Sequence, residues 1–139
     1  MYLTNGAIES CTVVSNYAAV SGGGLYIAGP DSSGTNNIIY FNTAPSSANF
    51  TNTAGNTGLQ YSCVIPAVDG ARNITNDPSL VNLSGNYRLN DNSPCVNAGL
   101  NQSWMTNTVD LDGRQRIRYG TVDMGAFEGI CGGTIYGFH

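Results

Sequence analysis

The residues best suited to chemistry gather in one stretch near the end of the chain, 109–128, which reads VDLDGRQRIRYGTVDMGAFE. It holds four of the nine acids and three of the five arginines. A pair of such carboxylates about 5–10 Å apart could hydrolyse a glycosidic bond. The same groups could instead form a polar clasp, in which arginines and main-chain N–H groups bind the carboxylates and hold a structural segment in place.

The first half of the chain offers little to support an active site. Residues 1–66 contain two acids, Glu9 and Asp31, and no Lys, Arg or His. They therefore supply neither a column of acids nor a general base of those types. We predict a protein that is not an enzyme and has no catalytic residues.

The predicted clasp consists of Asp110, Asp112, Gly113, Arg116, Asp123 and Glu128. In it, Gly113 allows positive φ in an Asp-rich turn, and Arg116 forms a fork with Asp110 or Asp123. A second interpretation places calcium at Asp110 and Asp112, because hard oxygen ligands suit this ion. A complete calcium site needs six or more oxygens, however, and DLDGRQR lacks the longer loop of calcium motifs. We therefore expect no cofactor.

Composition and charge exclude several function classes. The chain has 139 residues, which suits one domain, and a net charge of −4 without any Lys. Nucleic acids and anionic membranes are unsuitable partners, because binding to either requires clustered cations. No apolar run reaches the roughly 20 residues of a membrane span, and no signal peptide is visible in residues 1–10. With 41% apolar residues, the chain can bury enough surface to fold.

Short apolar clusters separated by Gly, Asn and Ser indicate strands rather than helices. They include CTVV (11–14), LYIA (25–28), NIIYF (37–41) and YSCVI (61–65). SCTVVSNYA (10–18) superposes on NNIIYFNTA (36–44), with Val13 on Ile39. A fixed offset of this size without helices predicts an all-β fold, a right-handed parallel β-helix in which each strand pairs with its copy one coil along.

The period ends after residue 66. We predict β-helix coils at 1–66 and a loop-rich closing segment of the same domain at 67–128. Because a stack of coils exposes its last apolar coil, we expect the closing segment to cover it. A β-prone tail follows at 129–139.

The same alignment predicts columns of equivalent residues. Asn16 falls on Asn42, and another step of the same length puts Cys11, Asn37 and Cys63 in one column. Stacked side chains of this kind form packing or hydrogen-bonding ladders. Asn16 and Asn42 each end an apolar run, where asparagine tolerates left-handed backbone geometry and hydrogen-bonds its own main chain.

Four cysteines are spread singly along the chain, so no C-x-x-C zinc pair is present. They are either small buried apolar residues or disulfide partners. If a disulfide forms, we predict Cys63–Cys95, because Cys95 lies in the closing segment and can reach a buried residue of a coil. Cys131 would then pair with Cys11 or with another chain.

The tail, GICGGTIYGFH, is aromatic and rich in strand-forming residues, whereas nothing in residues 1–10 resembles a cap for the first coil. We therefore predict that the tail donates a strand to a neighbouring chain, and that chains self-associate into oligomers or fibres. The residues assigned to this assembly are Cys131, Thr134, Ile135, Tyr136 and Phe138.

Three motifs follow one another in the second half: NDPSLVN (76–82), GNYRLNDNSPCVNAGLN (85–101) and DLDGRQRIRYGTVDMGAFE (110–128). In this order they resemble the C-terminal end of right-handed parallel β-helix surface proteins of bacteria, including the polymorphic-outer-membrane-protein-like and choice-of-anchor groups. The matching positions are Asp77, Pro78, Leu80, Tyr87, Leu89, Ser93, Pro94, Val96, Ala98, Gly99, Asp110, Asp112, Gly113, Arg116, Val122, Asp123, Gly125, Ala126, Phe127 and Glu128. Family members carry more coils upstream, and here the tail continues past the family's GAFE end.

The resemblance implies an extracellular or cell-surface location and a structural, adhesive or filament-forming role. Two alternatives use the same scaffold: a polysaccharide lyase or hydrolase, and a carbohydrate-binding module. In the second alternative, aromatic side chains stack on sugars. The candidates for that stacking are Tyr26, Tyr40, Tyr61 and Trp104.

Overall fold

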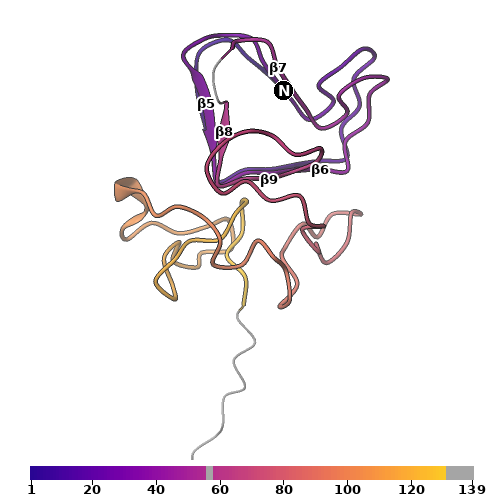
Figure 1. The fold of residues 1–139 in the computed structure, drawn as a ribbon. Helices are drawn as coiled ribbons and strands as arrows, with labels where there is room; N and C mark the ends of the chain where they lie inside the picture. Colours follow the sequence, from indigo (N-terminus) through magenta and orange to yellow (C-terminus); the bar gives the residue numbers. More distant parts are fainter. Residues whose placement is uncertain (56–57, 131–139) are drawn as a thin grey trace, which may run out of the picture.

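The structure, a computed structural model, describes residues 1–55 and 58–130. Its first half is the predicted parallel β-helix, in which each coil contributes three short strands (Figure 1). The first coil contains β1 (Tyr2–Leu3), β2 (Gly6–Glu9) and β3 (Thr12–Val14). The second contains β4 (Leu25–Ile27), β5 (Ser32–Thr35) and β6 (Ile38–Tyr40). The third contains β7 (Phe50–Asn52), β8 (Leu59–Gln60) and β9 (Cys63–Val64).

Equivalent strands stack into three parallel sheets, ordered β1-β4-β7, β2-β5-β8 and β3-β6-β9. Between the first two coils the predicted offset is confirmed in the third sheet, where Val13 pairs with Ile39. The next step in this sheet is shorter by one position, so Cys63 pairs with Ile38 rather than with Asn37. Since a slip of one position moves a side chain to the other face of a sheet, this step decides which way Cys63 points.

The predicted column of Cys11, Asn37 and Cys63 is therefore wrong at its third member. Ser62 takes that place, and its hydroxyl accepts a hydrogen bond from the Asn37 N–H at 3.1 Å. Asn73 continues the same column, because its Oδ1 accepts from the Ser62 N–H at 3.0 Å. The shorter second step explains the error, since the alignment assumed one constant period.

Side chains alternate along the strands and build two apolar clusters on opposite faces of the third sheet. The inner cluster fills the coils and contains Ile8, Leu25, Ile27, Ile39, Phe50, Leu59 and Val64. The outer cluster contains Ile38, Cys63, Leu89, Cys95 and Met124. The neighbouring residues Ile38 and Ile39 thus belong to different clusters, as the period of two in a strand requires.

The outer cluster reveals where the second half of the chain lies. Residues 76–130, named here the lateral segment, pack beside the sheet that contains β6 and β9 (Figure 1). The Gly125 N–H donates to the Asn36 carbonyl at 2.7 Å, and the Ala126 N–H donates to the Thr12 hydroxyl at 3.0 Å. A Cβ on Gly125 would lie 2.7 Å from Ile38 Cδ1, so only glycine allows this approach.

The expectation that all of 67–128 covers the last coil therefore needs correction. Residues 67–74 do so: Val68 packs against the inner cluster, and Ile74 pairs with Cys63 in a parallel bridge. The lateral segment instead covers the flank, from Thr12 in the first coil to Cys63 in the third. One short helix occurs among the described residues, the 3₁₀ turn η1 (Ser103–Met105). Within that part of the chain, no helix has the length and apolar character needed to span a membrane.

Sharp corners after β3, β5 and β6 place asparagine side chains against the neighbouring coil. Positive φ occurs at Ser15 and Phe41, one position before Asn16 and Asn42. The asparagines themselves are therefore not the left-handed residues, contrary to our expectation. Their predicted hydrogen bonds to local main chain are confirmed: Asn16 Nδ2 donates to the Val14 carbonyl, and Asn42 Nδ2 donates to the Tyr40 carbonyl, both at 3.0 Å.

Two corner asparagines of the second coil, Asn37 and Asn42, satisfy main-chain groups of the first. Asn37 Oδ1 accepts from the Cys11 N–H at 3.0 Å, and its Nδ2 donates to the Ile8 carbonyl at 2.9 Å. Asn42 does the same for the Asn16 N–H and the Val13 carbonyl. Because buried polar groups are costly when unpaired, these amides hold the corners in register.

We predict that replacing Asn37, whose side chain is fully buried, by Ala strongly destabilises the β-helix. The change leaves the Cys11 N–H without its side-chain acceptor and removes the Asn37 Nδ2 donor from the Ile8 carbonyl, which should lower the free energy of unfolding by about 2–4 kcal/mol. Urea denaturation followed by circular dichroism measures the change. Asn92→Ala, at an exposed position, is the matched control. Equal stability of the two variants would show that the side-chain hydrogen bonds of Asn37 do not stabilise the β-helix.

Candidate functional site

The Asp-rich turn at 110–113 uses its first carboxylate as an acceptor for main-chain N–H groups. Asp110 Oδ1 accepts from the N–H groups of Asp112 and Arg114, both at 2.8 Å, and Gly113 has a φ of 78°. Asp110 Oδ2 accepts from the Glu128 N–H at 2.7 Å. One buried side chain therefore closes the turn and attaches it to the end of the lateral segment.

Asp112 binds two arginines. Arg88 Nε donates to Asp112 Oδ2 at 2.6 Å, and Arg88 Nη2 donates to Oδ1, which makes a two-point fork. Arg114 Nη1 donates to the same Oδ2 at 2.7 Å. The Arg88 guanidinium also lies 4.9 Å from the centre of the Phe127 ring. These arginines hold the pKa of Asp112 below its usual range, with the hydrogen bond from Arg88 as the largest cause.

A second group of carboxylates is buried near the end of the lateral segment. Asp123 Oδ1 accepts from the Asn97 N–H at 2.6 Å, and its Oδ2 accepts from the Gly129 N–H. Glu128 Oε2 accepts from the Asp123 N–H at 3.0 Å. Arg116 pairs with Glu128 at 3.4 Å and donates to the Gly125 carbonyl at 3.2 Å.

The predicted fork of Arg116 with Asp110 or Asp123 is therefore wrong. Arg116 bonds Glu128, and the bidentate fork is formed by Arg88, a residue that our interpretation of the sequence did not include. Arg88 lies 24 positions before Asp112, and no spacing rule for loops connects them. The signal in the sequence for this ion pair was the composition. The chain has few arginines, and each buried acid requires a partner, so each arginine was a candidate.

Burial changes the protonation of two of these acids. It raises the pKa of Glu128 to about 7, and the nearby charge of Asp123 acts in the same direction. Burial also raises the pKa of Asp123. Hydrogen bonds from main-chain N–H groups and the charge of Arg116 partly oppose the rise at Glu128. Both carboxylates are at most 3% exposed, so they cannot reach a bound sugar without rearrangement.

The residues at 110–112 do not fit a calcium ion. Both oxygens of Asp110 face N–H donors, and both oxygens of Asp112 face guanidinium groups. Among the described residues, no group of three or more His, Cys, Asp or Glu side chains is arranged to hold a metal. In this arrangement the Asp110 carboxylate links main-chain N–H groups of the turn to the N–H group of Glu128, which is a structural role.

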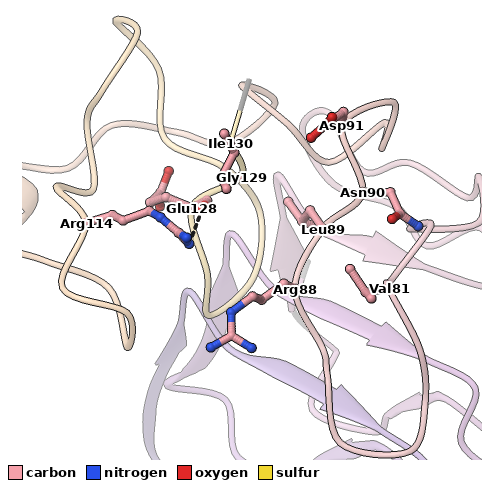
Figure 2. A pocket seen from close by; sticks show the side chains of 9 residues that line it. All are labelled: Val81, Arg88, Leu89, Asn90, Asp91, Arg114, Glu128, Gly129 and Ile130. Carbon is pink, nitrogen blue, oxygen red and sulfur yellow. Dashed lines mark hydrogen bonds between the residues drawn. The ribbon is translucent and has the colours of Figure 1, made fainter. Parts of the chain in front are cut away.

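A cavity of about 240 Å³ lies inside the lateral segment (Figure 2). Figure 2 shows Val81 and residues 88–91 on one side, and Arg114 with residues 128–130 on the other. Arg114 Nη1 donates to the Glu128 carbonyl at 3.3 Å, which ties one wall together. The charged groups on this wall are thus occupied by internal bonds.

The aromatic candidates for sugar binding are scattered. Tyr26 stacks on Tyr2 at 5.1 Å, and the Tyr40 hydroxyl donates to the Thr75 carbonyl at 3.0 Å. Trp104 is 43% exposed and lies apart from the other candidates, in η1. Tyr61 lines a groove of about 440 Å³.

That groove runs between the third coil and the lateral segment. Its lining residues are Tyr61, Arg72, Asn97, Ala98, Gly99, Leu100, Asn101 and Thr121. It combines an aromatic side chain, an exposed cation and amides, which are the groups that recognise acidic sugars.

Of the cysteines, Cys63 and Cys95 lie together in the outer cluster as free thiols, whereas Cys11 is half-buried in the first coil. The tail residues assigned to assembly, Cys131 through Phe138, lie outside the described residues.

The first coil forms an open edge of the β-helix. Within the described chain, β1, β2 and β3 each pair with one strand only, on the side of the second coil. Leu3 and Val13 pack on the inner cluster but remain partly exposed. An edge of this kind presents unpaired N–H and C=O groups and can accept another strand.

The fold and site together define a short parallel β-helix with a lateral segment held by buried carboxylates. Comparison with known proteins adds no relative: no protein-family model, curated protein or solved structure matches the chain.

We predict that the free energy of unfolding falls by about 3 kcal/mol as the pH rises from about 4.5 to 7. In this window the folded chain keeps a proton on Glu128 that the unfolded chain has lost, so raising the pH favours unfolding. The raised pKa of Asp123 acts in the same direction. Asp112 has the opposite effect, at lower pH, because its pKa is lowered on folding.

Glu128→Gln should remove most of this slope, as measured by urea denaturation across the pH range. Glu9→Gln is the matched control and should keep it. A slope that persists in Glu128→Gln would rule out Glu128 as its source.

Proposed function

We propose that this chain is a non-enzymatic β-solenoid, a structural or adhesive component of a cell surface that assembles by coil stacking or strand addition. The observation that carries the proposal is the difference between the two ends of the β-helix. The last coil is covered by residues 67–74, whereas the edges of β1, β2 and β3 are unpaired among the described residues. The extracellular location rests on the resemblance of the motifs at 76–128 to bacterial surface proteins.

The asparagine ladder, formed by Asn16, Asn42 and Asn49, supports this proposal because its hydrogen bonds all run in the same direction along the β-helix. The N–H and Nδ2 groups of Asn16 both donate to Asn42 Oδ1, at 3.0 Å. The same two groups of Asn42 donate to Asn49 Oδ1, at 2.9 and 3.1 Å. Asn16 Oδ1 is therefore the accepting end of the ladder, and it receives no hydrogen bond from the described chain. A further coil that carries asparagine at this corner would donate to it.

The parallel pairing of the strands supports one kind of partner. All strands of the β-helix pair in parallel, each with its equivalent in the next coil. The partner that fits is a parallel coil of about 25 residues whose inward side chains are apolar. A second copy of the chain supplies it in a homo-oligomer or fibre, either by adding a strand or by exposing its last coil, which residues 67–74 cover in this structure.

We predict that Leu3→Lys weakens self-association. Leu3 packs on the inner cluster from the first coil, so a lysine there places its charge where the added coil must bury apolar side chains. Sedimentation velocity over a range of concentrations, together with electron microscopy, measures the change. Leu83→Lys, at an exposed position of the lateral segment, is the matched control. The natural chain remaining monomeric at high concentration would contradict the proposal.

A longer chain tests the same edge without self-association. A copy of residues 25–49 placed before Met1 supplies one coil in register, because Leu25 pairs with Phe50 and Met1 adjoins Tyr2, which pairs with Tyr26. We expect this chain to be monomeric and to unfold at a higher temperature. A lower unfolding temperature would show that the first coil does not accept a neighbour.

The groove beside Tyr61 favours a second candidate function, binding of an acidic carbohydrate. Its exposed Arg72 can pair with a sugar carboxylate while Tyr61 stacks on the ring. If this function is correct, Tyr61→Ala should abolish binding of oligogalacturonate in isothermal titration calorimetry. Trp104→Ala, outside the groove, should leave it unchanged. Absence of binding by the natural chain would dismiss this candidate.

A further inference from the structure

Cys63 and Cys95 meet at the contact between the coils and the lateral segment. Cys63 lies in β9 and points outward, as the shortened second step dictates, while Cys95 follows Pro94 in the lateral segment. Neither residue has any exposed surface. Both belong to the outer cluster, together with Ile38, Leu89 and Met124. Cys63 Sγ donates to the Asn76 carbonyl at 3.2 Å.

Few other bonds join the lateral segment to the coils. Asn36 and Leu100 bond reciprocally, through Nδ2 to the carbonyl at 2.9 Å and through the N–H to Oδ1 at 2.6 Å. Gly125 and Ala126 add one main-chain donor each. The β-bridges within the lateral segment, such as Leu80 with Leu89, join it to itself. A covalent link at this contact would therefore change how firmly the segment is held.

We propose that Cys63 and Cys95 form a disulfide that fixes the lateral segment to the third coil. The sequence predicts this pair if a disulfide forms; the structure adds the outward direction of Cys63 and the place of both side chains in one buried cluster. The proposal does not depend on the proposed function, because it concerns the third coil and the lateral segment rather than the unpaired edge of the first coil.

The chemistry is thiol–disulfide exchange with a disulfide oxidant, such as glutathione disulfide. One protein thiolate attacks a sulfur of the oxidant, which gives a mixed disulfide and releases one glutathione thiolate. The second protein thiolate then attacks the protein sulfur of the mixed disulfide and releases the other glutathione. The two cysteines lose two protons and two electrons, and the oxidant is reduced to two thiols.

Burial explains when this exchange occurs. The contact with Cys95 and the loss of solvent raise the pKa of Cys63, so its thiol is unreactive once the lateral segment has docked. The bond therefore forms during folding, before the cluster closes. In the folded protein it is shielded from reductants.

The test uses the full chain, refolded in a mixture of reduced and oxidised glutathione. After free thiols are blocked with N-ethylmaleimide under denaturing conditions, trypsin cuts after Arg72, Arg88 and Arg114. The peptide 1–72 then carries Cys63, and the peptide 89–114 carries Cys95. We expect mass spectrometry to find these two peptides joined. Formation of the disulfide makes their combined mass two hydrogens lower than the sum of the two peptides with Cys63 and Cys95 as thiols. Two maleimide-labelled peptides, or glutathione adducts, would overturn the proposal.

Peptide 1–72 also contains Cys11, so the chain with Cys11→Ser and Cys131→Ser serves as the matched variant. Its oxidised form should unfold roughly 5–10 °C above its reduced form, because the bond closes a loop of about 30 residues. Adding Cys95→Ser should abolish this difference. An unchanged unfolding temperature on oxidation, or a difference that survives Cys95→Ser, would refute the bond between Cys63 and Cys95.

Discussion

The main-chain pairing of each coil with the next is the constraint on which the rest of this structure depends. A coil of very short strands cannot bury its apolar side chains alone, so it is stable only when a neighbour covers it. At the corners, where strands end and the chain turns, the hydrogen bonds between paired strands stop, and main-chain groups lose their partners. Asparagine amides at Asn37 and Asn42 replace those partners and keep successive coils in register.

The lateral segment solves the same problem by different means. It contains no strand and only a single 3₁₀ turn among its described residues, so most of its main chain has no regular partner. Asp110, Asp123 and Glu128 accept hydrogen bonds from its N–H groups, and each carboxyl group has two oxygens that can accept them. The cost is the burial of several acids close together, which is visible in the raised pKa values of Asp123 and Glu128.

These two devices keep the coils in register and cover one flank of them. The carboxylates are engaged with main chain and arginine, and this is why the acid-rich stretch has the form of a clasp rather than a catalytic pair. Among the described residues, the outer edges of β1, β2 and β3 have no strand beside them, and the proposed assembly rests on these edges.

The sequence by itself determined the fold class and much of the first half. The spacing of CTVV and NIIYF places Val13 beside Ile39, because similar local patterns form similar coils. It also determined the turn at Asp110 and Gly113, since that geometry involves only neighbours in the chain. Only the tertiary structure decided the rest. The second step in the third sheet is one position shorter than the first, and it turned Cys63 outward to face Cys95. Arg88 binds Asp112, and the lateral segment lies on the flank of the coils. These contacts join loops far apart in the chain, where no period relates sequence position to location in space.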